Sequence, residues 1–286
     1  MMTYRDLYTR LETLYDTREA QAIVRTILEI RFEMSYTDIV CGKVNELSAD
    51  KEKELEEIMR RLENGEPLQY ILGEAEFAGR TFNVEPGVLI PRPETAELCR
   101  LIVDDIKAIH KDTEPIVITD VGTGSGCIAI TLSLELLNSK VRAYDISTKA
   151  LEIAKKNAEL LRADVDFEIQ DALRLEPKSV DDKFMHIIVS NPPYIAEKEK
   201  EEMCKNVLDY EPSLALFVSD EDPLIFYRSI AEYGVKNLKD GDRIYYEINP
   251  IYAQEMVELM ESLGYRDIKI ANDLYGKQRM LRAIHA

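Results

Sequence analysis

The stretch that decides the fold is Asp120-Val121-Gly122-Thr123-Gly124-Ser125-Gly126. It ends an apolar run, 116–121, that predicts a buried strand, and it precedes a segment, 127–137, that predicts a helix. Glycines in such a turn let a ligand approach the backbone and the helix amino terminus. The spacing is G-x-G-x-G and differs from the G-x-G-x-x-G of dinucleotide enzymes. A tight turn without any ligand remains an alternative explanation of the glycines.

Strands and helices alternate along the sequence on both sides of the glycine stretch. The expected strands are 116–121, 141–145, 166–170, 184–189 and 242–248, and the expected helices are 94–110, 127–137, 148–161, 223–238 and 250–263. Strands separated by helices predict a parallel sheet covered by helices. Segments 265–270 and 279–284 are expected to close the sheet as a terminal hairpin. The polar stretch from Ile195 to about Ser219 is too long for an ordinary connection, which favours a functional loop.

The first 73 residues have helical periodicity and no strand signal. We expect helices over 4–15 and 20–32, the second opened by a capping box at 16–19, and a charged helix from about Ser48 to Asn64-Gly65. Alternating apolar residues around Gly79 then predict a hairpin at 76–84, and several prolines follow it. We therefore divide the chain into a helical amino-terminal domain (1–73), a hairpin and proline connector (74–93) and an α/β domain (94–286).

The composition limits the classes of protein that are possible. The chain has 286 residues, is 45% hydrophobic and carries a formal net charge of −18. It has no signal-peptide pattern at its start and no apolar run near the ~20 residues that cross a bilayer, so we expect a cytoplasmic protein without a membrane partner. Its cysteines lack metal-like spacing, so we expect no metal. Excess acid repels phosphate backbones, which favours a protein partner and argues against direct nucleic-acid binding.

Asp145 ends the next predicted strand, about 20 residues after the glycines, where an acid accepts hydrogen bonds from ribose hydroxyls. An aspartate that only caps helix 148–161 is the alternative. Asp171 and Ala172 end the strand after that and are candidates to border an adenine ring, although a plain turn explains them nearly as well. A ribose site without dinucleotide spacing favours a smaller nucleoside ligand, and S-adenosylmethionine fits.

The tetrapeptide Asn191-Pro192-Pro193-Tyr194 follows the predicted strand 184–189. Chemistry in open α/β sheets takes place at the carboxyl ends of strands. Consecutive prolines fix the backbone and remove two N–H donors, which leaves carbonyl groups free to accept from another molecule. An amide, free carbonyls and an aromatic ring thus converge in one loop. The structural alternative is a stiff turn with Tyr194 packed on the core.

Six segments together resemble the HemK/PrmC family, class I S-adenosylmethionine-dependent methyltransferases that methylate a glutamine of peptide chain release factors. The segments are Pro67 to Gly73, Leu89 to Thr95, Asp120 to Gly126, Val189 to Ile195, Tyr210 to Pro212 and Asp273 to Arg279. The resemblance covers nearly the whole chain. It departs from the family at Ala96, where an acidic residue is usual, and at Ile248-Asn249-Pro250, where a glycine is usual.

The resemblance implies a Rossmann-like domain with a mostly parallel seven-stranded sheet, a smaller amino-terminal helical bundle that recognises the release factor, and a hairpin between them. It also implies site residues. The cofactor-binding residues are Gly122, Thr123, Gly124, Ser125 and Gly126 at the methionine end, Asp145 at the ribose, Ala172 at the adenine, and Asn191. The substrate-binding residues are Asn191, Pro192, Pro193 and Tyr194, with Asn191, Pro192 and Tyr194 catalytic.

Our chemical hypothesis is that the Asn191 side-chain oxygen and the Pro192 carbonyl accept from the two N–H groups of a glutamine amide, while Tyr194 stacks on the amide plane. Rival functions are methylation of a ribosomal-protein glutamine, methylation of adenine in nucleic acid, and nucleoside binding without turnover. Three single residues also stay open. Arg92 contacts a ligand or holds the connector, Phe77 covers an adenine or packs on the core, and His186 is expected to be a core histidine. The role of Glu247 is not readable from the sequence.

Overall fold

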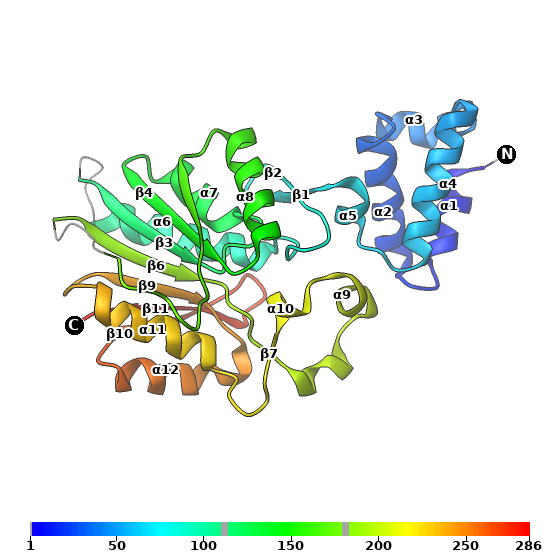
Figure 1. The fold of residues 1–286 in the computed structure, drawn as a ribbon. Helices are drawn as coiled ribbons and strands as arrows, with labels where there is room; N and C mark the ends of the chain where they lie inside the picture. The colour runs from blue at the N-terminus through cyan, green and yellow to red at the C-terminus, as the bar shows by residue number, and fades with distance from the viewer. Residues whose placement is uncertain (1, 110–113, 179–182) are drawn as a thin grey trace. The chain divides into compact units, whose positions relative to one another are not determined.

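The computed structural model describes residues 2–109, 114–178 and 183–286. Contacts divide the chain into two compact units (Figure 1). The first unit contains residues 1–74 and the segment Cys204–Tyr210, and the second contains Ala75–Met203 and Glu211–Ala286. Segment Cys204–Tyr210 thus groups with the helical unit, although it lies far along the sequence from it.

The first unit is a helical bundle. Its helices are α1 (Tyr4–Leu11), α2 (Thr17–Ile30), α3 (Tyr36–Val40), the short 3-10 helix η1 (Lys43–Glu46), α4 (Ala49–Glu63) and α5 (Leu68–Leu72). On α2, the apolar residues Ala20, Val24, Ile27 and Leu28 recur on one helix face, and all are buried. Helix α1 ends at Leu11 and not at Tyr15, because Asp16 caps α2 by accepting hydrogen bonds from two backbone N–H groups of that helix.

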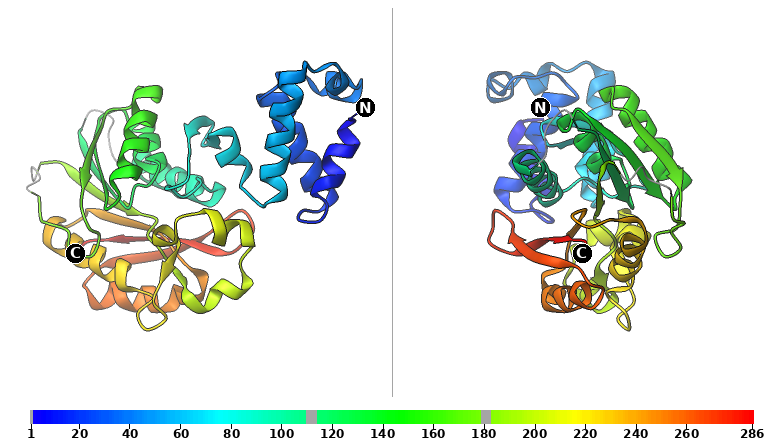
Figure 2. Two further views of the ribbon diagram at one scale, coloured as in Figure 1. Left: turned by 45° about the vertical axis from the view of Figure 1, so that its right-hand side comes forward. Right: turned by 90° about the vertical axis from the view of Figure 1, so that its left-hand side faces the viewer.

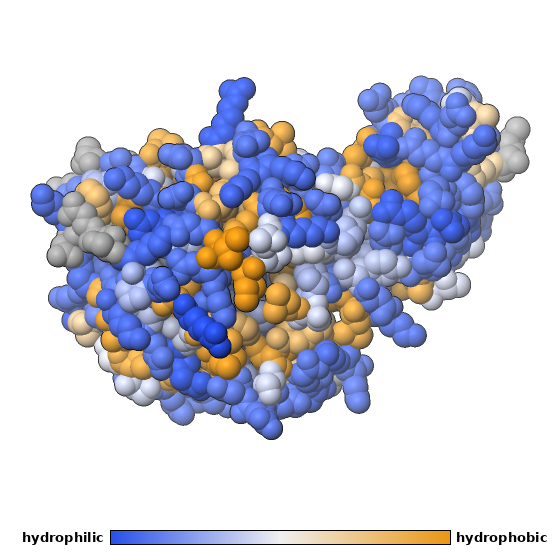
Figure 3. All heavy atoms as spheres, in the orientation of Figure 1, coloured by the Kyte–Doolittle hydropathy of each residue, from blue (hydrophilic) through white to orange (hydrophobic). Residues whose placement is uncertain are grey.

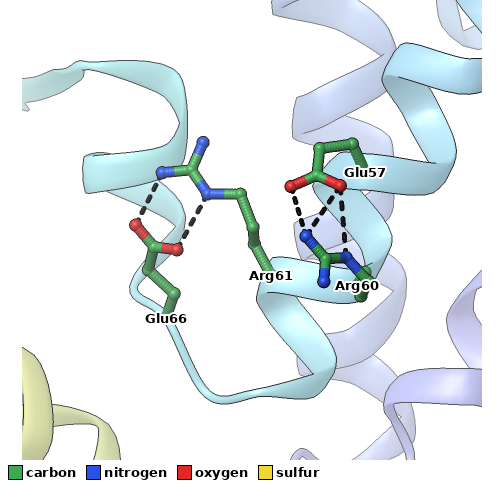
Figure 4. A network of polar contacts seen from close by, with 4 residues as sticks. All are labelled: Glu57, Arg60, Arg61 and Glu66. Atoms are coloured by element: carbon green, nitrogen blue, oxygen red, sulfur yellow. Dashed lines mark hydrogen bonds and ion pairs between the residues drawn. The ribbon is translucent and has the colours of Figure 1, made fainter.

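A pair of charged side chains shapes the turn after α4 (Figure 4). Arg61 and Glu66 point toward one another, with Nη2 of Arg61 2.6 Å from Oε1 of Glu66 and Nε 2.8 Å from Oε2. Arg60 bonds Glu57 one turn earlier on the same helix. The half-buried Arg61 pair spans the turn, whereas the Arg60 pair is exposed and screened by solvent, so it is expected to contribute little to stability.

The hairpin predicted at 76–84 is present as β1 (Glu74–Phe77) and β2 (Arg80–Asn83). Its turn places Ala78 and Gly79 at φ values of 49° and 72°, a left-handed geometry that suits glycine. Asn157 of α8 (Thr148–Leu161) fixes the hairpin, because its Oδ1 accepts from Asn83 N at 2.7 Å and its Nδ2 donates to Asn83 O at 3.0 Å. The hairpin is therefore held against the α/β part of the second unit.

The second unit contains a seven-stranded, mostly parallel sheet of order β10-β11-β9-β6-β3-β4-β5. The strands are β3 (Ile116–Val121), β4 (Ser139–Asp145), β5 (Val165–Ile169), β6 (Met185–Ser190), β9 (Arg243–Glu247), β10 (Arg266–Asn272) and β11 (Gln278–Ile284). Strands β10 and β11 pair with each other, and β11 with β9, in antiparallel orientation. The predicted α/β class and terminal hairpin are confirmed.

Helices cover both faces of this sheet (Figures 1 and 2). One core cluster joins the sheet to α6 (Pro93–Ile109), α7 (Cys127–Glu135) and α8. The other joins it to α11 (Ile225–Asn237) and α12 (Ala253–Ser262). Residue 110, where the prediction placed the end of α6, lies outside the described residues.

The polar stretch after Tyr194 is not an unstructured loop. It contains β7 (Ile195–Ala196), the 3-10 helix η2 (Glu197–Glu202), α9 (Lys205–Tyr210), α10 (Ser213–Leu216) and β8 (Phe217–Val218), and the two short strands pair in parallel. The prediction of helix 250–263 also needs refinement. The 3-10 helix η3 (Pro250–Tyr252) precedes α12 there, because Asn249 accepts from Ile251 N and begins a new turn at the proline.

Candidate active site

The sheet register brings the predicted site residues to one edge. Val121 of β3 is paired with Tyr144 of β4 on one side and with Ser190 of β6 on the other. Gly122, Asp145 and Asn191 are the next residues of these three parallel strands. Each therefore emerges at the same level of the carboxyl edge, where open α/β sheets bind their ligands.

A cavity of about 430 Å³ opens at this edge. Six predicted site residues line it: Gly122, Gly124, Asp145, Ala172, Asn191 and Pro193. The rest of the wall is mostly apolar and includes Val88 and Leu89 of the connector, Ile146, Leu214 and Phe226, with Ser147, Gln170 and Asp171 as polar members. On the face that Figure 3 shows, apolar side chains gather in the middle of the second unit among hydrophilic ones. A cavity of this size with few polar groups is typical of a small-molecule site.

The glycine loop leaves open space along the cavity wall. Gly122 and Gly124 have φ values of 76° and 55°, and a Cβ added to either would meet no atom within 4 Å. The N–H groups of Gly122 and Thr123 donate to the Tyr144 carbonyl at 2.8 and 2.9 Å, which ties the loop to β4. The loop is thus held in place while its backbone borders the cavity.

Asp145 accepts hydrogen bonds from the glycine loop and from the residue that caps α8. Its Oδ2 accepts from Gly124 N at 2.9 Å and its Oδ1 accepts from Ser147 N at 2.9 Å. A carboxylate has about four acceptor positions, so each oxygen keeps capacity for a ligand hydroxyl. Burial raises the pKa of Asp145, and the backbone N–H groups oppose that rise. The capping of α8 itself falls to Ser147, whose hydroxyl accepts from Ala150 N.

Thr123, Ser125 and Gly126 are not among the residues that line the cavity. Thr123 is buried and donates its hydroxyl to Asp120 Oδ2 at 2.6 Å, and the same oxygen accepts from Ala129 N at 3.2 Å. Burial raises the pKa of Asp120 to about 7. Gly126 is packed tightly, since a Cβ there would lie 2.9 Å from Ile130 Cδ1. In this structure these residues support the glycine loop through contacts in the protein interior.

Some residues of the tetrapeptide loop line the cavity, and the others pack in the core. Asn191 and Pro193 line the cavity, whereas Pro192 is buried and Tyr194 packs against the core cluster of α11 and α12. Asn191 donates from Nδ2 to Thr95 Oγ1 at 3.1 Å. Tyr194 donates its hydroxyl proton to Glu247 Oε1 at 2.9 Å. Burial raises the pKa of Tyr194 well above its usual value, so the phenol stays neutral.

Thr95 and Glu247 are site residues that the sequence reasoning missed. Thr95 Oγ1 donates to Glu247 Oε2 at 2.6 Å, and both residues are nearly inaccessible to solvent. One signal was available for Glu247, because it ends β9, which lies next to β6 in the sheet. No periodicity or spacing points to Thr95.

Arg92 forms an ion pair with the buried Glu211, and Glu211 Oε2 also accepts from Ile90 N at 3.1 Å. Glu211 directly precedes Pro212, which lines the cavity together with Leu214. One carboxylate therefore joins the connector wall to the α10 wall. Between the two alternatives for Arg92, the structure shows the one in which it holds the connector.

Phe77 and His186 belong to the core. Phe77 is buried and packs edge-to-face on Phe82 with ring centroids 5.8 Å apart, and it is absent from the cavity wall. His186 is buried within β6, and burial lowers its pKa to about 4. The prediction that His186 is a core histidine and not a catalyst agrees with this position.

Comparisons with known proteins define the fold and the family. Residues 99–210 match the methyltransferase small domain family, and residues 5–73 match the PrmC N-terminal domain family. Among solved structures, the catalytic domain of hMettl16 in complex with a MAT2A 3'UTR hairpin has a TM-score of 0.55 and 16% identity, covering 78% of this chain and 82% of that chain. The delta-N METTL16 methyltransferase domain has a TM-score of 0.52 and 18% identity, covering 78% and 97%.

Sequence relatives are much closer than these fold neighbours. The release factor glutamine methyltransferase of Bacteroides thetaiotaomicron is 50% identical over 96% of this chain and 95% of its own length. Enzymes of the same name from Flavobacterium psychrophilum and Lactococcus lactis are 40% and 38% identical, covering 98% and 94% of this chain and 97% and 94% of their own lengths.

The fold is that of the class I methyltransferases, and the methyltransferase small domain match together with the named relatives makes this chain an S-adenosylmethionine-dependent methyltransferase. The relatives that match over nearly the whole length of both proteins then identify the family. This chain belongs to the release factor glutamine methyltransferase family. Within the described parts of the chain, no helix is long and apolar enough to cross a membrane. No group of three or more His, Cys, Asp or Glu side chains among the described residues is arranged to hold a metal ion.

Proposed function

We propose that this enzyme methylates the side-chain amide nitrogen of the glutamine in the Gly-Gly-Gln motif of peptide chain release factors. The observation that carries the proposal is the position of Asn191, whose amide lines the same cavity as the glycine loop and Asp145. A methyl donor held at the glycine loop and a glutamine amide held at Asn191 would thereby be adjacent. A release factor substrate places the enzyme in the cytoplasm.

The cavity residues suit S-adenosylmethionine, which supplies a methyl group on a positively charged sulfur and becomes S-adenosylhomocysteine. The open backbone at Gly122 and Gly124 admits the methionine part, and Asp145 retains acceptor capacity for ribose hydroxyls. Ala172 and Leu173 are apolar residues of the cavity wall, and an adenine ring packed on them buries no unpaired polar group of theirs. The other predicted residues, Thr123, Ser125 and Gly126, support the loop from behind.

The chemical difficulty is that an amide nitrogen is a poor nucleophile. Its lone pair is delocalised into the carbonyl, the resonance that gives amides a rotation barrier of about 18–20 kcal/mol. An acceptor at each N–H orients the nitrogen and stabilises positive charge as it develops. Nδ2 of Asn191 is directed at Thr95, so Oδ1 of Asn191 is left to accept from the substrate. The carbonyl of Pro192 is the second acceptor in this proposal.

Alignment is the main contribution expected from this loop. Holding nitrogen, methyl carbon and sulfur in line can lower the barrier by roughly 7–11 kcal/mol, whereas one ordinary hydrogen bond contributes about 0.5–1.5 kcal/mol. The proton leaves after the methyl group has been added, when the nitrogen has become acidic, so no strong base is needed beforehand. The ring of Tyr194 packs on the core and does not line the cavity, so we assign this residue to holding the loop in place and not to stacking on the substrate amide.

We assign recognition of the release factor to the helical unit of residues 1–73, with 74–93 as connector and 94–286 as methyltransferase domain. This unit includes exposed apolar side chains on α3, namely Tyr36 and Val40, and at the end of α2, namely Ile30, which suit contact with a protein. Acidic residues outnumber basic ones over the whole chain, with 54 Asp and Glu against 36 Lys and Arg. A polyanionic substrate is disfavoured by that charge.

Incubation with labelled S-adenosylmethionine tests the proposal. Purified release factor, ribosomal proteins, duplex DNA and RNA are offered in parallel reactions. Label on the release factor, with none on the others and none on a release factor whose Gly-Gly-Gln glutamine is replaced, is the expected result. Label on a ribosomal protein or on nucleic acid establishes one of the rival activities, and cofactor binding without any transfer establishes a non-enzymatic role.

A further inference from the structure

Glu247 carries a carboxylate into the core at the end of β9, beside the tetrapeptide loop. Its residue exposure is 2%. The side-chain hydrogen bonds that the structure shows for it go to Thr95 and Tyr194, and Arg279 acts on it only through its charge. A buried acid is costly compared with an apolar residue of similar size. The position of this charge therefore calls for an explanation beyond packing.

The directions of the hydrogen bonds around Thr95 are determined by Glu247. Burial raises the pKa of Glu247, and the hydroxyls of Thr95 and Tyr194 and the charge of Arg279 oppose that rise. Each oxygen of the carboxylate accepts from one of these hydroxyls, so the single hydroxyl proton of Thr95 is donated to Glu247 Oε2 across 2.6 Å. Thr95 Oγ1 can then only accept from Asn191, which it does from Nδ2 at 3.1 Å. This arrangement forbids the flipped amide, in which Oδ1 of Asn191 would face Thr95 and Nδ2 would face the cavity.

The same acid also holds the other end of the loop. Its second oxygen, Oε1, accepts from the Tyr194 hydroxyl at 2.9 Å. Two residues further along the chain, Asn249 Nδ2 donates to the Tyr194 carbonyl at 3.1 Å. The end of β9 thus fixes the tetrapeptide at its first and last residues, and only the carboxylate sets the orientation of the Asn191 amide.

We propose that Glu247 and Thr95 are positioning residues that keep the oxygen of the Asn191 side chain directed at the substrate amide. This inference rests on the proposed function, because Asn191 is assigned there as the acceptor. The charge on Glu247 matters as well as its shape. A neutral glutamine at this position can donate to Thr95, which frees the Thr95 proton for Asn191 Oδ1 and permits the amide to turn its N–H groups toward the substrate.

The first test compares two substitutions at Thr95. Thr95→Val keeps the shape and removes the hydroxyl, whereas Thr95→Ser keeps the hydroxyl and removes a methyl group. We expect Thr95→Val to lower kcat on release factor at least tenfold, with the Kd for S-adenosylmethionine and the KM for release factor changed less than threefold. Thr95→Ser is expected to restore most of kcat. Thermal unfolding of both variants shows whether each is folded.

The decisive readout is non-additivity. If Thr95 and Glu247 act through Asn191, then Thr95→Val or Glu247→Gln made in an Asn191→Ala background causes no further loss of kcat. A role only in packing predicts losses that multiply. Glu247→Gln alone is expected to lower kcat at least tenfold, and it serves as the test if Thr95→Val does not fold.

Failure of this inference is distinguishable from failure of the proposed function. Wild-type enzyme that transfers no methyl group to release factor contradicts the proposed function itself. Wild-type transfer combined with normal kcat in Thr95→Val and Glu247→Gln overturns the positioning role, as do multiplicative losses in the Asn191→Ala background.

Discussion

Asp145 Oδ2 accepts a 2.9 Å hydrogen bond from the backbone N–H of Gly124, which joins the ends of two neighbouring parallel strands. The predicted ribose acceptor and the predicted methionine cradle are therefore one hydrogen-bonded unit. A substitution at Asp145 removes the predicted acceptor for the ribose. It also removes the partner of the Gly124 N–H group and is therefore expected to change the shape of the glycine loop.

Asp145→Ala should weaken S-adenosylmethionine binding by about 10- to 100-fold. The reason is that hydrogen bonds to a charged group contribute about 1.5–3 kcal/mol, and the Gly124 N–H also loses its partner. Isothermal titration calorimetry measures the change, with Asp164→Ala, outside the cavity wall, as a matched control. Normal affinity in Asp145→Ala would refute the assignment of this residue to the cofactor.

Asn191→Ala should leave the Kd for S-adenosylmethionine within a few-fold and remove most of kcat. The side chain lines the cavity beside the glycine loop, and we assign it to the substrate amide. Steady-state methyl transfer to release factor, together with calorimetry, separates the two effects. Asn272→Ala, at an exposed position of β10, is the control and should behave as wild type. Unchanged turnover in Asn191→Ala would contradict the account.

Glu211→Ala should lower stability by about 1–3 kcal/mol and weaken cofactor binding. The substitution leaves the Ile90 N–H without its acceptor and separates two walls of the cavity. The exposed pair of Arg100 and Asp104, with a 3.7 Å separation, offers a control, because Asp104→Ala should change stability by less than about 1 kcal/mol. Denaturant unfolding and calorimetry measure both quantities, and equal effects of the two substitutions would argue against a structural tie at Glu211.

The stability of the protein should depend on pH through Asp120. Burial raises its pKa from 3.8 to about 7, so the folded state favours the protonated acid. The stabilisation of the fold by protonated Asp120 is complete below pH 3.8. It is lost as pH rises through about 7, which lowers the free energy of unfolding by on the order of a few kcal/mol. His186 has the opposite trend, since its lowered pKa destabilises the fold as pH falls toward about 4.

Asp120→Asn isolates this effect. His186 is common to both proteins and cancels when their free energies of unfolding are subtracted. The difference between variant and wild type should therefore move in favour of the variant as pH rises from about 4 to about 7. Urea unfolding at a series of pH values measures it, and a difference that stays constant with pH would show that Asp120 does not titrate in this way.

Periodicity predicted most of the elements of the second unit because their burial patterns are regular. Strand β3 has six consecutive buried residues, and its limits, Ile116–Val121, were predicted correctly. Helix α8 was likewise predicted correctly, since Ser147 caps it and its buried face is regular. The stretch after Tyr194 was harder, because β7 and β8 are two residues long and are defined by their pairing with each other.

The residues of the candidate site were likewise predictable only in part. Gly122 and Asn191 directly follow strands and Asp145 ends one, so their convergence was predictable from a parallel sheet. The contact of Thr95 with Glu247 joins residues 152 positions apart, and that of Asn191 with Thr95 joins residues 96 apart. No local pattern specifies such meetings, because they depend on which helix face packs against which strand end. The sequence indicated the candidate catalytic loop but not the residues that hold it in place.

The central claim is that the loop after β6 directs a methyl group to the amide nitrogen of one glutamine. The most direct measurement is tandem mass spectrometry of a release factor treated with this enzyme and S-adenosylmethionine. The account predicts a single added methyl group on the side-chain nitrogen of the Gly-Gly-Gln glutamine, and none when Asn191→Ala replaces the wild-type enzyme. A methyl group on another residue, or equal modification by Asn191→Ala, would contradict it.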